Sequence, residues 1–389
     1  VKATESSPED ATCWSTLANL YRELGRFEEA INAYGEALAI APELENTRYN
    51  LAWTLLDAGQ PGAAKQQFQR VLKGGAADAE THHGLGLSLF ELGDLPGAKR
   101  ELDRAVKLDP RLAPAWYDLG NWYRHSHDNT HAIEAYRHTL RLDPHDAQAH
   151  NNLGNCLLEI ADYEQAREHL QLAARLRPSP EAFLSLAAVL GLQQRWAEQQ
   201  KACEAALSLA PDDQQVLLMV GELAFDKGDY QAAETAFRRA CDKWPDASAP
   251  RSALGKALLR LERPEESCEI CHQAVTLDPE YADAYLNLGC AQKFLGRYEA
   301  AVTSFEKAVS LDNTFMQAYN NLGLCYVDLG DFDRAYQCFD EALAIEPDAA
   351  DVLASLLTTQ KVTPEHAFRV ERLETLLHGG RLDRETTLR

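Results

Sequence analysis

The sequence predicts an all-α protein made of stacked antiparallel helix pairs. Three observations predict this fold. A pattern of apolar and small residues recurs about every 34 residues. Ala and Leu are abundant while aromatic residues make up only 8 % of the chain, which suits helices better than sheets. The 389 residues exceed the usual size of one globular core, so a repeat array is expected.

The repeating pattern is seen by stepping along the chain in blocks. Apolar residues recur at three- and four-residue spacing in two runs within each block, as two amphipathic helices require. The block from 113 contains Trp116, Leu119, Gly120, Tyr123, Ala132, Tyr136 and Pro144, and the block from 316 contains Tyr319, Leu322, Gly323, Tyr326, Ala335, Phe339, Ala342 and Pro347.

Glycine and proline mark the expected ends of these helices. A Gly often separates the two runs, where it can adopt the left-handed conformation that ends a helix; these are Gly25, Gly59, Gly93, Gly228, Gly296 and Gly330. A Pro follows the second run in most blocks and stops that helix. A further Gly inside many first runs, such as Gly289, predicts close approach of the second helix near a small residue, here Ala301.

These residue types and spacings resemble the tetratricopeptide repeat family. Ten such repeats cover residues 11–347, most of the chain. The resemblance implies a right-handed superhelical solenoid and a protein-binding role. It divides the chain into a remnant of a preceding repeat (1–10), repeats one to five (11–179), repeats six to ten (180–347) and C-terminal capping or transition helices (348–389). The joint before 180 is one residue short and reads Arg177-Pro178-Ser179-Pro180, which predicts an irregular repeat or a hinge.

The two ends of the chain suggest a piece of a longer protein. Ala3 and Pro8 fit the end of a preceding repeat, and Arg384–Arg389 carries no stop signal. A last helix is expected to start at Thr363-Pro364-Glu365. The stretch Val370–Leu377 also resembles the segment before the enzyme domain of bacterial repeat-plus-sulfotransferase proteins. No phosphosulfate-binding loop is present, so no catalytic residue is carried over.

Charge and cysteine content restrict the partners and the compartment. The formal net charge is −22, which disfavours nucleic acid and anionic membranes. No apolar run reaches the ~18 residues of a membrane span, and the polar start of the chain predicts no signal peptide. Nine Cys scattered among helices argue against a disulfide framework. We therefore expect a cytoplasmic, reducing location.

No motif predicts catalysis, a metal or a cofactor. Cys268 and Cys271 form a C-x-x-C without a second pair, and the repeat phase favours core packing of Cys271. Eight His lie between 82 and 150, and are expected to be solvated or to line the groove: His82, His83, His125, His127, His131, His138, His145 and His150. No phosphate loop, nucleophile elbow or Rossmann glycine set occurs.

The family resemblance places ligands on the concave face of the first helices. There, repeat position 6 would carry a row of Asn, whose amides can grip a peptide backbone. Four Asn occupy it: Asn50, Asn152, Asn287 and Asn321. Thr16, Gly84 and Ala253 are among the residues that interrupt the row, and Asp118 takes it in the fourth repeat. A row of ligand-binding amides and Asn tolerated at a helix crossing both stay open.

Two patches on this face are candidate binding sites. Repeats four and five contribute a polar, aromatic-edged patch: Tyr117, Asn121, Arg124, Asn151 and Asn155, beside Asn152. Repeats eight and nine contribute a basic cluster: Lys256, Arg260 and Lys293. Lys256 and Arg260 share one helix face, so they predict an anion site, unless they pair with Glu222 or Asp226.

Three functions fit this reading. The first is an interaction scaffold that binds a peptide or protein segment in the groove. The second is the repeat segment of a larger sulfotransferase or glycosyltransferase. The third is a self-assembling scaffold.

Overall fold

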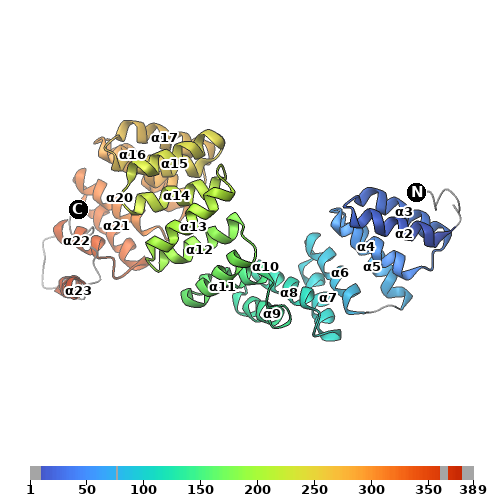
Figure 1. Ribbon diagram of the computed structural model, residues 1–389. Helices are drawn as coiled ribbons and strands as arrows, with labels where there is room; N and C mark the ends of the chain where they lie inside the picture. The colour runs from blue at the N-terminus through green and yellow to red at the C-terminus, as the bar shows by residue number, and fades with distance from the viewer. Residues whose placement is uncertain (1–9, 76–77, 360–366, 379–389) are drawn as a thin grey trace. The chain divides into compact units, whose positions relative to one another are not determined.

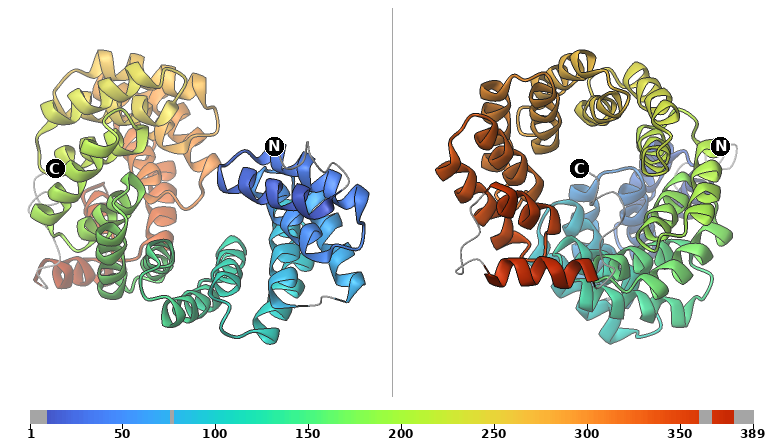
Figure 2. Two further views of the ribbon diagram at one scale, coloured as in Figure 1. Left: turned by 45° about the vertical axis from the view of Figure 1, so that its right-hand side comes forward. Right: turned by 90° about the vertical axis from the view of Figure 1, so that its left-hand side faces the viewer.

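All regular structure in the described part of the chain is α-helical (Figure 1). This computed structural model describes residues 10–75, 78–359 and 367–378. The predicted fold class, an all-α array of helix pairs, is confirmed. The chain divides into two compact units, Val1–Gln199 and Gln200–Arg389, each described by itself. Within each unit, helix pairs follow one another in chain order (Figure 2).

Each pair consists of a first helix and a second helix. The first helices are α2 (Ala11–Glu23), α4 (Glu45–Asp57), α6 (Ala79–Glu91), α8 (Ala113–His125), α10 (Ala147–Glu159), α12 (Pro180–Leu192), α14 (Gln214–Asp226), α16 (Ser248–Arg260), α18 (Ala282–Phe294) and α20 (Met316–Asp328). The second helices are α3 (Phe27–Ile40), α5 (Pro61–Gly74), α7 (Leu95–Leu108), α9 (Asn129–Leu142), α11 (Tyr163–Leu176), α13 (Trp196–Leu209), α15 (Tyr230–Lys243), α17 (Pro264–Leu277), α19 (Tyr298–Leu311) and α21 (Phe332–Ile345).

The turn between the two helices uses a left-handed residue in every one of these pairs. The six glycines predicted there all have positive φ, and the remaining four pairs place His127, Ala161, Gln194 and Glu262 in the same conformation. The chain geometry therefore demands this conformation whether or not a Gly supplies it.

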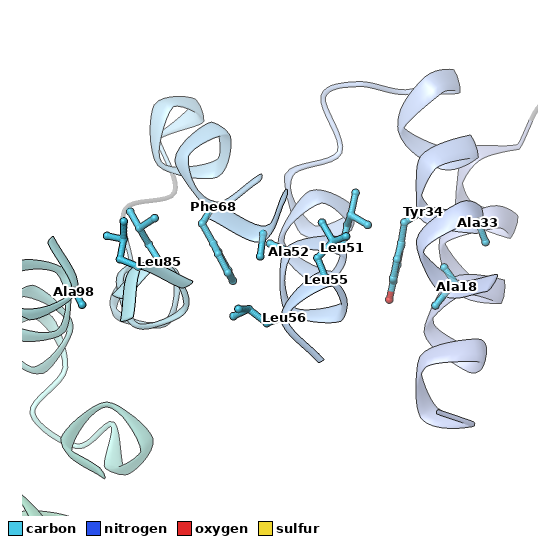
Figure 3. Packing of buried hydrophobic residues seen from close by; sticks show 13 residues of the cluster. Ala18, Ala33, Tyr34, Leu51, Ala52, Leu55, Leu56, Phe68, Leu85 and Ala98 are labelled. Atoms are coloured by element: carbon cyan, nitrogen blue, oxygen red, sulfur yellow. The ribbon is translucent and has the colours of Figure 1, made fainter. Parts of the chain in front are cut away.

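Side chains of the second helices fill the layer between successive first helices. Figure 3 shows the Tyr34 ring between Ala18 and Leu51, and the Phe68 ring between Ala52 and Leu85. Both rings are fully buried. A residue at this repeat position, Phe305 in the ninth pair, also explains the mid-helix glycines. A Cβ built on Gly289 would lie 2.6 Å from a Phe305 ring carbon, so the close approach involves that ring more than the small Ala301 suggested by sequence.

The first helices form the inner, concave side of each unit. Successive first helices contact one another directly in most neighbouring pairs, for example α16 with α18. Successive second helices make no comparable contacts in the described part of the chain. Such a stack curves toward its first helices, so their side chains that point away from the second helices face the concave side.

The irregular joint and the C-terminal helices follow local rules. Helix α12 starts one residue early against the 34-residue spacing; Ser179 caps it by accepting from the Ala182 amide at 3.2 Å. The last described helices are α22 (Ala350–Thr359) and α23 (Ala367–His378). Arg369 of α23 pairs with Asp340 of α21 at 2.7 Å. The helix start expected at Thr363–Glu365 lies outside the described residues.

Candidate functional site: the concave face of the first helices

A hydrogen-bonded trio joins the first two repeats on the concave face. Tyr34 donates from its hydroxyl to Asn19 Oδ1 at 2.6 Å. Asn50, one of the predicted position-6 residues, donates from Nδ2 to the same oxygen at 3.2 Å. The amide of Asn50 therefore satisfies a group of the preceding repeat, and the buried tyrosine hydroxyl has a partner, as burial requires.

The same trio recurs three repeats later. Tyr136 donates to Asn121 Oδ1 at 2.8 Å, and Asn152 donates to that oxygen at 3.1 Å. Asn152 also donates to the Tyr117 hydroxyl at 3.1 Å. Three predicted site residues, Tyr117, Asn121 and Asn152, are thus brought together in the layer of α8, α9 and α10.

The other two position-6 residues also donate within the chain. Asn287 donates to the Ser252 hydroxyl at 2.9 Å, and Asn321 to the Gln317 carbonyl of its own helix at 2.9 Å. Each of the four Asn thus has a donor committed to an internal bond. A peptide backbone in the groove could therefore bond only to the donors and acceptors of these amides that the internal bonds leave unused.

Unsatisfied polar groups of the polar patch lie on α8 and α10. Asn151 Oδ1 is enclosed and has no hydrogen-bond partner in the described part of the chain. Asn155 is partly exposed, and no hydrogen bond of its side chain occurs among the described residues. Arg124 is exposed and forms no ion pair there. Asn155 and Arg124 therefore leave donors and acceptors accessible, whereas the Asn151 oxygen is enclosed and unsatisfied.

Aromatic rings, rather than carboxylates, contact two of the three cations in the basic cluster of repeats eight and nine. Lys256 Nζ lies 4.4 Å from the centre of the Phe225 ring. Arg260 donates to the Tyr230 hydroxyl at 2.8 Å and stacks on that ring. No ion pair to Glu222 or Asp226 occurs in the described part of the chain. Cation–π contact orients a cation without neutralising it.

The charges of this cluster affect the pKa values of a neighbouring acid and a neighbouring thiol. Burial raises the pKa of Glu222, Asp226 raises it further, and Lys256 opposes both. Lys293 is partly buried; burial raises the pKa of the Cys290 thiol to about 11, against the opposing charge of Lys293. The cluster therefore combines cations with one acid that burial and a neighbouring charge make harder to ionise.

A pocket in repeats one and two was missed by sequence reasoning. It has a volume of about 550 Å³. Its lining is Asn19, Arg22, Glu23, Phe27, Asn50 and Asp57. Arg22 pairs with Asp57 across it, at 3.1 Å. Only Asn50 was predicted; the signal that points to the rest is the recurrence of Tyr, Asn and Asn at the same spacing in repeats four and five.

Three histidines expected to be solvated or to line the groove are buried instead. His82 and His150 are 4 % and 5 % exposed. The expectation was wrong because each finds a partner on its second helix: His82 Nδ1 lies 2.8 Å from Glu101, and His150 Nδ1 lies 2.8 Å from His169 Nδ1. His83 is buried as well and lies 2.6 Å from Asp118, which links α6 to α8.

The cysteine pair behaves as the repeat phase predicts. Cys271 is fully buried, and burial raises the pKa of its thiol to about 12, which makes it a packing residue. Within the described residues, no group of three or more His, Cys, Asp or Glu is placed to hold a metal ion. No helix there is long and apolar enough to cross a bilayer.

Family comparisons match repeat models along the chain. A model described as "Tetratricopeptide repeat" matches residues 49–114, 83–127, 117–183 and 184–248. Two others of that description match 282–315 and 317–349, and a "TPR repeat" model matches 18–59.

Individual relatives share only part of their length with this chain. The human and mouse (Homo sapiens, Mus musculus) proteins named "Cell division cycle protein 16 homolog" are each 31% identical over 112 residues, which is 26% of this chain and 18% of theirs. The chain thus aligns with less than a fifth of these relatives. A structure titled "Functional Characterization of Pseudomonas Aeruginosa pilF" aligns with a TM-score of 0.47 at 22% identity, over 56% of this chain and 97% of that one.

Proposed function

Because this chain belongs to the tetratricopeptide repeat family, we propose that it is a scaffold that binds an extended segment of a partner protein along its concave face. The observation that carries the proposal is the open hydrogen-bonding capacity of repeats four and five. An enclosed oxygen without a partner, such as Asn151 Oδ1, costs free energy that an N–H group of a bound segment would recover once the Asn151 side chain rotates toward it.

An extended peptide suits this patch chemically. Its backbone presents N–H and C=O groups in alternation. Asn151 Oδ1 accepts from an N–H, and the Asn155 amide donates to a C=O. The Tyr117 hydroxyl accepts one bond from Asn152 and keeps its own proton to donate. Recognition of this kind reads the backbone, while side chains of the partner meet neighbouring groove positions.

The basic cluster of repeats eight and nine supports a second contact. Lys256 and Arg260 are oriented by rings and keep their charge. We assign them, with Lys293, to acidic side chains of the partner. Replacing Lys256 and Arg260 by Ala would then weaken an acidic ligand, and an unchanged affinity would remove this contact from the proposal.

The test starts from a random-peptide display library selected on the full chain. Affinities of the selected peptides are then measured by fluorescence anisotropy for three proteins: wild type, Asn151→Ala/Asn155→Ala, and the control Glu168→Ala. Glu168 is exposed on second helix α11 and makes no described hydrogen bond.

We expect the double variant to bind at least about tenfold more weakly, since two backbone contacts are lost, and the control to match wild type. Circular dichroism verifies that both variants melt like wild type. Selected peptides that bind all three proteins equally would contradict the proposed site.

A further inference from the structure

Unit 1 contains two sets of residues at equivalent repeat positions, three repeats apart. The repeat-1/2 site is Asn19, Arg22, Glu23, Phe27, Asn50 and Asp57, the lining of the pocket described above. The repeat-4/5 site consists of the residues at the same repeat positions: Asn121, Arg124, His125, Asn129, Asn152 and Glu159.

The two sites share one framework. In both, a buried tyrosine hydroxyl and a position-6 amide donate to a single Asn oxygen, at 2.6 and 3.2 Å in the first and at 2.8 and 3.1 Å in the second. In both sites an Arg lies one helical turn after this Asn on the same first helix. An acid lies on the next first helix.

The sites differ in what the acid does. In the repeat-1/2 site, Asp57 accepts hydrogen bonds from both Nε and a terminal nitrogen of Arg22, at 3.2 and 3.1 Å. In the repeat-4/5 site, Glu159 instead accepts the Asn129 side-chain amide at 2.6 Å. The residue equivalent to Asn129 in the first site is Phe27, which has no amide to donate. Glu159 is therefore bound to Asn129, and it forms no ion pair with the arginine among the described residues.

Arg124 is consequently left with its charge open. It is exposed, and within the described residues it forms no ion pair. Its charge is felt locally: burial raises the pKa of Tyr136 and of the Cys156 thiol, and Arg124 opposes the rise at both. The open guanidinium of Arg124 is a local positive charge in a chain of net charge −22, whose field repels an acidic ligand elsewhere.

We propose that the repeat-4/5 site is a carboxylate subsite, with Arg124 as the binding residue and Asn129 as the positioning residue that keeps it open. The guanidinium fork matches a carboxylate with two parallel hydrogen bonds. A doubly charged phosphate suits the site less, because Asp118 and Glu159 lie on the same face. The carboxylate comes from an acidic side chain or from a chain terminus of the bound segment. This inference rests on the proposed function.

The experiment uses the peptides selected by display on the full chain. Each is synthesised in three forms: the parent, an amidated C-terminus, and Asp/Glu replaced by Asn/Gln. Their affinities are measured for wild type, Arg124→Gln, Asn129→Phe/Glu159→Asp, and the control Arg22→Gln. The Asn129→Phe/Glu159→Asp variant rebuilds the closed geometry of the repeat-1/2 site. The reciprocal variant Phe27→Asn opens that site.

We expect Arg124→Gln and Asn129→Phe/Glu159→Asp each to weaken the parent peptides at least tenfold, and Arg22→Gln to change them less than twofold. For the peptide form that lacks the bound carboxylate, these losses vanish, a coupling that mere structural damage does not produce. The peptide form in which the losses vanish identifies the source of the bound carboxylate. Loss of the effect on amidation indicates the chain terminus, and loss of the effect on replacement of Asp/Glu by Asn/Gln indicates an acidic side chain. Phe27→Asn should create new affinity for carboxylate peptides at the repeat-1/2 site.

Two results would overturn the inference in distinguishable ways. If peptides are sensitive to Asn151→Ala/Asn155→Ala but bind Arg124→Gln as they bind wild type, the groove binds segments without a carboxylate subsite. If no selected peptide is sensitive to the groove variants at all, the proposed function fails and this inference fails with it.

Discussion

At the scale of single residues, the left-handed backbone conformation recurs in the turn of each of the ten helix pairs, including four turns where the sequence has no glycine. Ten turns need a left-handed residue, and Ala161 is one of the four positions that supply it without glycine, with φ of 60°. A side chain in this region costs roughly 1–2 kcal/mol. These turns therefore store strain that a single substitution can relieve.

Ala161→Gly should raise the free energy of unfolding by about 0.5–1 kcal/mol, because the relieved strain exceeds the added freedom of the unfolded chain. Urea unfolding followed by circular dichroism measures this. The matched control is Gly296→Ala, at φ 69°, which should shift the midpoint the opposite way. A lower midpoint for Ala161→Gly would contradict this account of the turn.

Glycines inside the first helices follow a different rule. A Cβ on Gly289 would lie 2.6 Å from the Phe305 ring, whereas one on Gly35, in second helix α3, would meet nothing within 4 Å. We expect Gly289→Ala to lower the free energy of unfolding by about 1–3 kcal/mol through overpacking. Gly35→Ala should raise it by up to about 1 kcal/mol through helix propensity. Equal effects in chemical denaturation would show that packing does not explain Gly289.

At the scale of helices, one repeat position ties three first helices of unit 1, α4, α8 and α10, to the chain before them. Arg48, Trp116 and His150 occupy this position and donate to the carbonyls of Pro42, Pro110 and Pro144 at 2.6, 3.0 and 3.2 Å. The requirement is a donor of suitable reach rather than a particular residue. This explains why His150 is buried although its residue type suggested a solvated side chain.

The His150–His169 pair predicts a pH dependence of stability. Burial, together with the charges of His150 and Arg137, lowers the pKa of His169 from 6.5 to about 4. The unfolded chain therefore binds a proton that the folded chain does not between pH 6.5 and 4. Stability from this group is complete above pH 6.5 and is lost as the pH falls toward 4.

We expect wild type to lose about 1–2 kcal/mol more stability than His169→Gln when the pH is lowered from 7.5 to 5. Gln is the residue that repeat two places at this position, where Gln67 accepts from Arg48 at 3.2 Å. Urea unfolding at both pH values measures the difference. Parallel losses in the two proteins would show that His169 does not titrate in this way.

The fold was predictable from the sequence to a degree that the site was not. Repeat spacing, turn glycines and core positions depend on local pattern, and the structure reproduces them, as with the buried Cys271. Side-chain partners depend on which residues face each other across repeats. Arg22 and Arg124 occupy the same repeat position, yet only Arg22 forms an ion pair, because Asn129 engages Glu159. No single-repeat pattern contains that information.

At the scale of the whole molecule, the array behaves as a series of neighbouring layers. Each pair packs mainly on the next pair, so stability sums over adjacent layers and each groove position belongs to two repeats. The net charge of −22 surrounds this groove with negative potential, against which the few cations on the concave face stand out. Binding is therefore expected to concentrate at repeats four and five and at repeats eight and nine.

The central claim is that a partner segment lies on the concave face of the first helices. Photo-crosslinking of the full chain with the selected peptides tests it most directly. A benzophenone side chain replaces Asn155 on first helix α10 in one protein, and Glu168 on second helix α11 in the other. We predict a covalent peptide adduct from position 155 and none from position 168; adducts from position 168 alone would contradict the account.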